Sequence, residues 1–329
     1  MERRHHLPRL SALLLFAALA HAPLAQAADT LDPVRNDIVQ GQADDAIKRL
    51  RQILGSNNQN GDAHNLYCRV SLQLDAWDDA VDHCERAVNI SQDNSNYHLW
   101  LGRAYGAKAE RASMFSAYGL ARKLKAEFET AVRLDPRNAA ALSDLGEFYV
   151  SAPAVVGGGD AKAQALSPKL DVVDAVRGHE LRAQIADADK DYAAAESELK
   201  AAIAASRTPA NQWMALASFY RRRERWDDMT QAIKTGIAAD KAHTVAQVDG
   251  ASTFIRTQRE LQLAAQMLRD YIASSQKSED APAFRVHVEL GKLLAKQGDK
   301  EGAKREFQAA LALAHDYKPA ASQLAALGH

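Results

Sequence analysis

Arg35, Arg69 and Arg103 recur at an interval of 34 residues. Arginine suits the recognition of carboxylate and phosphate groups, because its planar guanidinium donates two hydrogen bonds at once in a fixed geometry. A row of arginines at a constant interval could therefore bind an anionic ligand. Two alternatives are a solvated face that carries arginine by chance, and pairing of the arginines with a neighbouring acid such as Glu147.

The sequence contains none of the common patterns of an enzyme centre. Gly-x-Ser-x-Gly, Gly-x4-Gly-Lys-[Ser/Thr], His-Glu-x-x-His and Cys-x-x-Cys are all absent. The Gly157–Gly159 run before Asp160 could bind an anion at a helix start, but it is more typical of a turn followed by a capping aspartate. We therefore expect a protein that is not an enzyme, with no catalytic residue, no cofactor and no metal site.

Residues 1–27 have the three parts of a cleavable secretory signal peptide. Arg3 and Arg4 precede an apolar run at 10–20, and Ala25-Gln26-Ala27 forms a small-x-small cleavage site. An apolar run of about eleven residues is too short to span a bilayer. We therefore predict cleavage after Ala27 and a periplasmic or secreted protein, in preference to a membrane anchor.

Export would bring Cys68 and Cys84 into an oxidising compartment, where disulfides form. The two residues are 16 apart and fall on the two helices of one repeat, as argued below. Two interpretations stay open: a disulfide, or two buried thiols that pack as small apolar side chains.

The composition favours closely packed helices, because alanine is abundant, apolar residues make up 47% of the chain and aromatic residues only 6%. Removal of residues 1–27 leaves 38 basic and 41 acidic residues, a net charge of −3. Such a chain lacks the basic footprint of a general nucleic-acid binder. No later segment has the length of a membrane helix, so we expect neither nucleic-acid binding nor stable membrane insertion.

The residues named above lie on segments with helical periodicity. Residues 96–136 read as two helices with apolar side chains at i, i+3 and i+4, and Pro136 ends the second. The first half-pattern, Leu101-Gly102-Arg103-Ala104-Tyr105, returns 44 residues later at 145–149. Such recurrence predicts a repeat protein.

The repeated pattern resembles the tetratricopeptide repeat, a 34-residue helix–turn–helix with the signature W-x2-L-G-x2-Y, A-x3-F, P. The matching sets are Trp213/Leu216/Ala217/Tyr220, Leu101/Gly102/Tyr105, Phe128/Ala131/Pro136, Leu142/Leu145/Gly146/Tyr149 and Ala303/Phe307/Ala310. The stretch 152–160 is also similar to a loop in exported bacterial proteins of this kind.

This resemblance implies an all-α fold, a right-handed superhelical solenoid of about eight repeats with a short C-terminal capping helix. The repeats are expected at about 29–60, 61–94, 95–138, 139–175, 176–209, 210–243, 244–283 and 284–317, and the cap at 318–329. In such a stack each unit buries its apolar faces only against its neighbours, so the two ends should fray.

Two units exceed the repeat length. About ten extra residues lie between Tyr105 and Leu124 in the third unit, and about five at 152–160 in the fourth. The plain interpretation is a longer first helix and a wide turn. Insertions of this kind often mark a binding face, and these two should emerge on the same edge of the solenoid.

The resemblance also predicts which side chains face the concave groove, because first helices build that surface in this family. The groove residues implied are Arg35, Asn65, Arg69, Asn96, Trp100, Arg103 and Glu147. Some family members clamp a peptide carboxylate with lysine and asparagine, and Asn65 matches one such place. The lysine places are held by other residues, so that class of partner is put in doubt.

His64, His98, His179 and His287 fall where the repeat signature has tryptophan, so we interpret them as packing residues and not as metal ligands. The function expected is a non-enzymatic exported scaffold that binds a protein or peptide in its groove. The alternative is an accessory module for cell-envelope polysaccharide or peptidoglycan assembly, which would bind an anionic polymer through the arginines.

Overall fold

A computed structural model of the chain describes residues 24–328, and this part is helical throughout, with no strand. The helices are α1 (Leu24–Gln40), α2 (Ala43–Ser56), α3 (Gly61–Gln73), α4 (Trp77–Ile90), α5 (Ser95–Ala109), α6 (Met114–Leu134), α7 (Ala139–Ser151), η1 (Ala154–Val156), α8 (Asp160–Val173), α9 (Ala175–Ala188), α10 (Tyr192–Ala205), α11 (Ala210–Arg222), α12 (Trp226–Ala239), α13 (Val245–Thr257), α14 (Leu261–Ala273), α15 (Ala283–Lys296), α16 (Lys300–Leu313) and α17 (Lys318–Ala326). The predicted signal peptide lies outside the described residues, apart from its last four, which begin α1.

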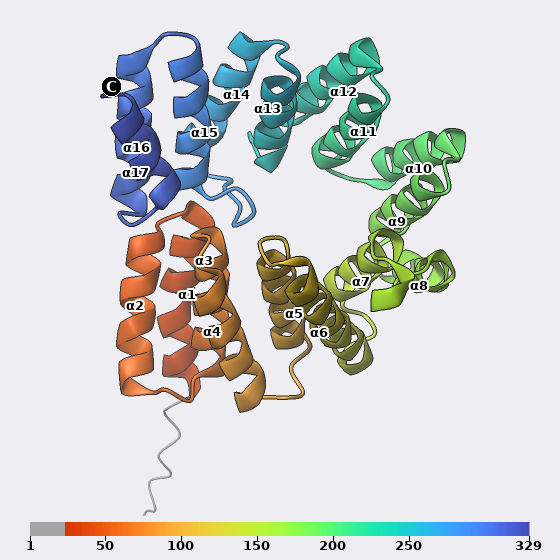
Figure 1. Ribbon diagram of the computed structural model, residues 1–329, viewed down its shortest axis with the longest axis vertical. Coiled ribbons are helices and arrows are strands. Elements are labelled where there is room, and N and C mark those ends of the chain that lie inside the picture. Colours follow the sequence, from red (N-terminus) through yellow and green to blue (C-terminus); the bar gives the residue numbers. More distant parts are fainter. Residues whose placement is uncertain (1–23, 329) are drawn as a thin grey trace, which may run out of the picture.

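The helices form eight successive antiparallel pairs, α1–α2 through α15–α16, followed by the single helix α17 (Figure 1). The predicted fold class is therefore confirmed as an all-α helical repeat superhelix. Asparagines define where three first helices begin. The side chains of Asn60, Asn94 and Asn138 accept hydrogen bonds from backbone N–H groups in the first turns of α3, α5 and α7, which would otherwise lack partners.

Glycines allow the two helices of a pair to approach closely. A Cβ added to Gly102 would overlap the ring of Phe128, and one added to Gly291 would overlap the ring of Phe307. Each glycine lies on a first helix and each phenylalanine on the second helix of the same pair. The glycine and phenylalanine of the sequence pattern are therefore the two sides of one packing contact.

The extra residues of the third pair lengthen its second helix. The first helix, α5, has 15 residues, close to its equivalents, whereas α6 has 21. The interpretation of a longer first helix is therefore wrong, because the inserted residues continue the helical pattern that leads into Leu124 and Phe128. The short helix η1 of the fourth pair contacts α6, with Gly157 beside the Lys125 side chain, so the second insertion meets the helix that the first one lengthens.

The superhelix closes on itself, and its last helices lie against its first (Figure 1). We call this contact the closing interface; it joins α1–α3 and the turn after α3 to the 274–282 loop and α15–α17. Arg285 of α15 donates to the carbonyl oxygens of Gln73 and Leu72 and to the carboxylate of Asp75, at 2.7, 3.2 and 2.6 Å. Farther along the interface, the backbone N–H of His315 donates to Asp44 of α2 at 3.0 Å.

Apolar packing also crosses the closing interface. Most buried apolar side chains of α1–α3 belong to the same hydrophobic cluster as those of α10–α17. By contrast, α6–α8 bury theirs in a second cluster, and α4 and α5 bury theirs mainly in a third, around Cys68 and Cys84. Gly41, in the turn after α1, lies so close to Ala283 that a Cβ there would overlap its backbone nitrogen. The expectation that each unit buries its apolar faces only against its neighbours in the chain is therefore wrong for the part of the chain that the structure describes.

Candidate functional site

A cavity of about 410 Å³ opens on the concave side of the N-terminal helices. Its walls come from α1, α3, α5, α7 and the 274–282 loop. It brings together six of the seven residues predicted for the groove, Arg35, Asn65, Arg69, Asn96, Trp100 and Arg103. We call it the arginine–tryptophan cavity. Glu147, the seventh, is not among its lining residues.

Trp100 is the meeting point of two arginines. The guanidinium carbons of Arg69 and Arg103 lie 4.8 and 4.6 Å from the centroid of the Trp100 ring. Cations over an indole face are attracted by the negative charge density of the ring. Arg69 comes from α3, whereas Trp100 and Arg103 come from α5, the first helix of the next pair. The stack therefore fixes these three side chains relative to one another across two repeats.

Each of the three predicted arginines has an acidic partner. Arg69 donates to Glu279 with Nε and Nη2, at 3.0 and 2.6 Å. Arg103 donates to Asp144 of α7, with Nε at 2.6 Å. Arg35 is exposed and pairs with Asp32 one helical turn earlier, at 2.8 Å. Pairing with neighbours, left open by the sequence, is thus what the structure shows, but the partner is not Glu147.

The carboxylates around Arg103 affect its pKa. Burial alone would lower the pKa of the Arg103 guanidinium, but the hydrogen bond and charge of Asp144, together with the charges of Asp280 and Glu279, raise this pKa above its ordinary value. Glu147 lies beside the same group. Desolvation and the charge of Asp144 raise the pKa of its carboxyl, against the opposing effect of Arg103.

The two asparagines of the cavity differ in their surroundings. Asn65 is 6% exposed, and its Nδ2 has no hydrogen-bond partner among the described residues. An unpaired buried amide is costly, and because this nitrogen is itself buried, a ligand would accept a hydrogen bond from it only after a neighbouring side chain moved aside. Asn96 is exposed and accepts a hydrogen bond from Asn138 at 3.3 Å.

Sequence reasoning missed the acids that complete the site. Asp144 lies one helical turn before Glu147 and could have been found from that spacing. Glu279 and Asp280 could not, since they come from a loop about 210 residues after Arg69. Tyr97, whose hydroxyl donates to Asp62 at 2.6 Å, also lines the cavity wall.

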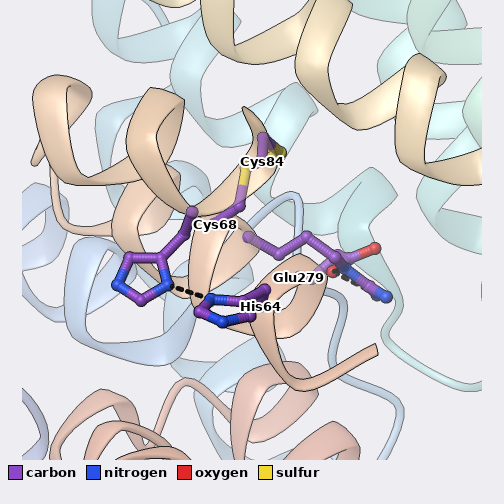
Figure 2. The surroundings of a disulfide bond; sticks show 6 residues. His64, Cys68, Cys84 and Glu279 are labelled. Carbon is purple, nitrogen blue, oxygen red and sulfur yellow. Dashed lines mark hydrogen bonds and ion pairs between the residues drawn. A yellow bond between two sulfur atoms is a disulfide. The ribbon is translucent and has the colours of Figure 1, made fainter. Parts of the chain in front are cut away.

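A disulfide joins Cys68 of α3 to Cys84 of α4, with Cα atoms 5.3 Å apart and both side chains fully buried (Figure 2). Figure 2 shows it with His64 and Glu279 in its surroundings. Cys68 directly precedes Arg69 and lies one turn after Asn65. The covalent link therefore anchors the helix that presents Asn65 and Arg69 to the cavity.

The histidines at the tryptophan position of the repeat signature connect the two helices of their pairs. His98, His179 and His287 lie within hydrogen-bond distance of Glu127, Glu198 and Glu306, at 2.6, 2.7 and 2.6 Å. His64 instead meets His83 of α4, with their Nδ1 atoms 2.9 Å apart. In residues 24–328 no group of three or more histidine, cysteine or acidic side chains could hold a metal ion.

Within that part of the chain, too, none of the helices has the length and apolar character that crossing a bilayer requires.

Comparison with known proteins supports the fold. Residues 38–103 match the tetratricopeptide repeat family. The solved structure of TTC0263, a thermophilic TPR protein of Thermus thermophilus, is similar with a TM-score of 0.50 and 18% identity, over 58% of this chain and 97% of that chain. Yeast Tom70 is similar with a TM-score of 0.57 and 13% identity, over 97% of this chain and 66% of that chain. No curated protein sequence matches.

Proposed function

We propose that this chain, a tetratricopeptide-repeat protein, is a non-enzymatic scaffold that holds a segment of a partner protein in the arginine–tryptophan cavity. Protein–protein interaction is the usual role of the repeat. The observation that carries the proposal is the stack of Arg69, Trp100 and Arg103 beside the unpaired amide of Asn65. A held aromatic ring and guanidinium donors suit the backbone and side chains of an extended peptide.

Preorganisation supports this role. Trp100 is fixed by two arginines and α3 by a disulfide, so binding immobilises few side chains that were free before. Affinity benefits, because less conformational entropy is lost on association.

The charge pairing favours a peptide over an anionic polymer. A polymer of repeated phosphates or carboxylates needs a continuous run of unpaired cations, whereas Arg35, Arg69 and Arg103 each face an acid. Polymer binding would also weaken steeply with added salt.

We further propose that the protein works outside the cytoplasm, in a periplasm or a secreted state. Residues 1–27 have the order of a signal peptide, and the Cys68–Cys84 disulfide suits an oxidising compartment. Expression of the full chain in a bacterium, followed by N-terminal sequencing of the periplasmic fraction, tests this: we expect a chain that begins at Ala28. An uncleaved chain confined to the cytoplasm would contradict it.

Selection of binders from a random peptide library tests the scaffold role. We expect the selected peptides to lose at least about tenfold in affinity for a Trp100→Ala variant, in line with the loss of an aromatic contact at the centre of an interface. The matched control is Tyr192→Ala, because Tyr192 also stacks with an arginine, Arg223, but lies outside the cavity. Peptides that bind Trp100→Ala as tightly as wild type would overturn the proposal.

A further inference from the structure

The Glu279 carboxylate occupies a position that a ligand could take. It belongs to the 274–282 loop, between α14 and α15, and reaches Arg69 on α3 across the closing interface. The contact is well shielded, with 21% of the Arg69 side chain and 22% of the Glu279 side chain exposed. Charge-assisted hydrogen bonds at such sites are stronger than neutral ones.

Arg69 and Glu279 also separate two spaces. Together with Trp100 they line both the arginine–tryptophan cavity and a neighbouring cavity of about 160 Å³, which extends to Gln73 and Arg285. The ion pair therefore stands between the two cavities, at the end of the Trp100 stack. If Glu279 left Arg69, the two spaces would join into a longer groove along α3.

The loop has a second attachment that does not depend on the Glu279 carboxylate. Gln73, itself buried, donates its amide to the backbone oxygen of Glu279 at 3.0 Å and to that of Ile38 at 3.3 Å. The side chain of Glu279 could thus leave Arg69 while the loop backbone stays docked. The Arg69–Glu279 pair is an exchangeable contact within a closing interface that other bonds hold.

From this geometry we propose that the arginine–tryptophan cavity takes a peptide carrying an acidic side chain, and that the ligand carboxylate replaces Glu279 on Arg69. Glu279 thus acts as a built-in competitor that lowers the affinity of every peptide. Peptides without an acidic side chain that can reach Arg69 cannot displace it and therefore bind poorly. The inference rests on the proposed function, since it names the chemistry of the segment held there. Ligand binding and the Glu279 contact exclude each other, so each weakens the other by the same factor.

Two matched variants separate this competition from the general charge of the loop. Glu279→Gln removes the competing charge from Arg69 with little change of shape. Asp280→Asn removes an equal charge from the next residue, whose carboxylate lies near Arg103 but accepts its hydrogen bond from Ser278. The probe is a fluorescein-labelled, amidated tetraglutamate peptide, and tetraglutamine is the neutral control. Binding is measured by fluorescence anisotropy at fixed ionic strength.

We expect Glu279→Gln to bind tetraglutamate about tenfold more tightly than wild type, the equivalent of about 1.4 kcal/mol. Asp280→Asn should change the affinity by less than about threefold, and tetraglutamine should not distinguish the three proteins. Adding Arg69→Gln to Glu279→Gln should abolish the gain. Equal affinity of Glu279→Gln and wild type, or an equal gain from Asp280→Asn, would overturn the proposal.

Hydrogen exchange gives a readout in the wild-type protein. Saturating tetraglutamate should speed amide exchange in residues 274–282, because the loop then keeps its Gln73 bond but loses its second attachment, the contact of Glu279 with Arg69. Unchanged exchange in the bound protein would overturn the competition. These results are distinct from failure of the scaffold role. That role fails if no library peptide depends on Trp100, whereas the tetraglutamate titration reports whether Arg69 becomes available when Glu279 is neutral.

Discussion

Closure of the superhelix can be tested at Gly41, where the first helix pair meets the last. Gly41 follows α1 with φ +74°, a left-handed conformation, and a Cβ there would overlap the backbone nitrogen of Ala283. The matched position is Gly298, which follows α15 with φ +88° and has open space around its missing Cβ. Substitution of either glycine by alanine incurs the conformational cost, but only Gly41→Ala also forces the closing interface apart.

The magnitudes follow from these two costs. A left-handed conformation costs an alanine about 1–2 kcal/mol, so Gly298→Ala should lower the free energy of unfolding by that amount. Overlap with backbone adds about 1–3 kcal/mol, which gives about 2–5 kcal/mol for Gly41→Ala. Urea denaturation followed by circular dichroism measures both values. Small-angle scattering should show a larger radius of gyration for Gly41→Ala alone.

Equal losses in the two variants, within about 0.5 kcal/mol, would refute the reasoning. So would an unchanged radius of gyration in Gly41→Ala. Either result would mean that the turn after α1 does not bear on Ala283 in solution.

Three further predictions concern the disulfide and two shifted pKa values. The double substitution Cys68→Ser/Cys84→Ser should lower the free energy of unfolding by about 3 kcal/mol, the value for a closed loop of about 15 residues. Reduction of the wild type with dithiothreitol should have the same effect. An unchanged midpoint of urea denaturation would contradict this. Although the Asp249 side chain is exposed, desolvation by the surrounding protein and the charges of Asp280 and Glu289 raise its pKa to about 6. Its contribution to stability is therefore present near pH 4 and is lost as the pH rises through 6. Asp249→Asn should therefore raise the melting temperature at pH 7.5 and not at pH 4, and equal gains at both would argue against the shift. Burial and the neighbouring His64 lower the pKa of His83 to about 4, so the unfolded chain takes up this proton first and stability falls as the pH drops from 6.5 to 4. His83→Gln should flatten melting temperature against pH in that window, and an unaltered slope would count against this residue.

The local packing could be predicted from the sequence because it is repeated in the sequence. Gly102 and Phe128 belong to one pair of helices, and their contact needs only a short turn between them. The signature therefore identified the pairs and the side of each first helix that faces the cavity. Six of the predicted groove residues share one cavity for this reason.

Closure could not be predicted in this way. It depends on the small rotation between each pair and the next, summed over eight pairs, and the 34-residue period does not encode that angle. The partner of Arg69 lies 210 residues away, in a loop that departs from the repeat signature. Pairing of Arg69 with Glu279 was therefore out of reach of any reasoning about neighbours.

The acidic partner of Arg103 was predicted one helical turn away from its actual position. Glu147 was expected to face the groove because it follows the tight glycine of its unit, and it does lie near Arg103. Asp144, one turn earlier on α7, is the acid that reaches the guanidinium. Arginine side chains are long enough to select among acids on successive turns, and the repeat pattern does not specify which one they choose.

The meeting of the first and last helices limits how the chain can change its length. An open solenoid tolerates the gain or loss of a repeat, because each new unit only needs neighbours on either side. Here an added or deleted pair would alter the total rotation and carry Arg285 away from Asp75, in the turn after α3. Closure thus fixes the number of helix pairs. Duplication of a unit, which an open array would tolerate, would here break the closing interface at a point far from the duplication.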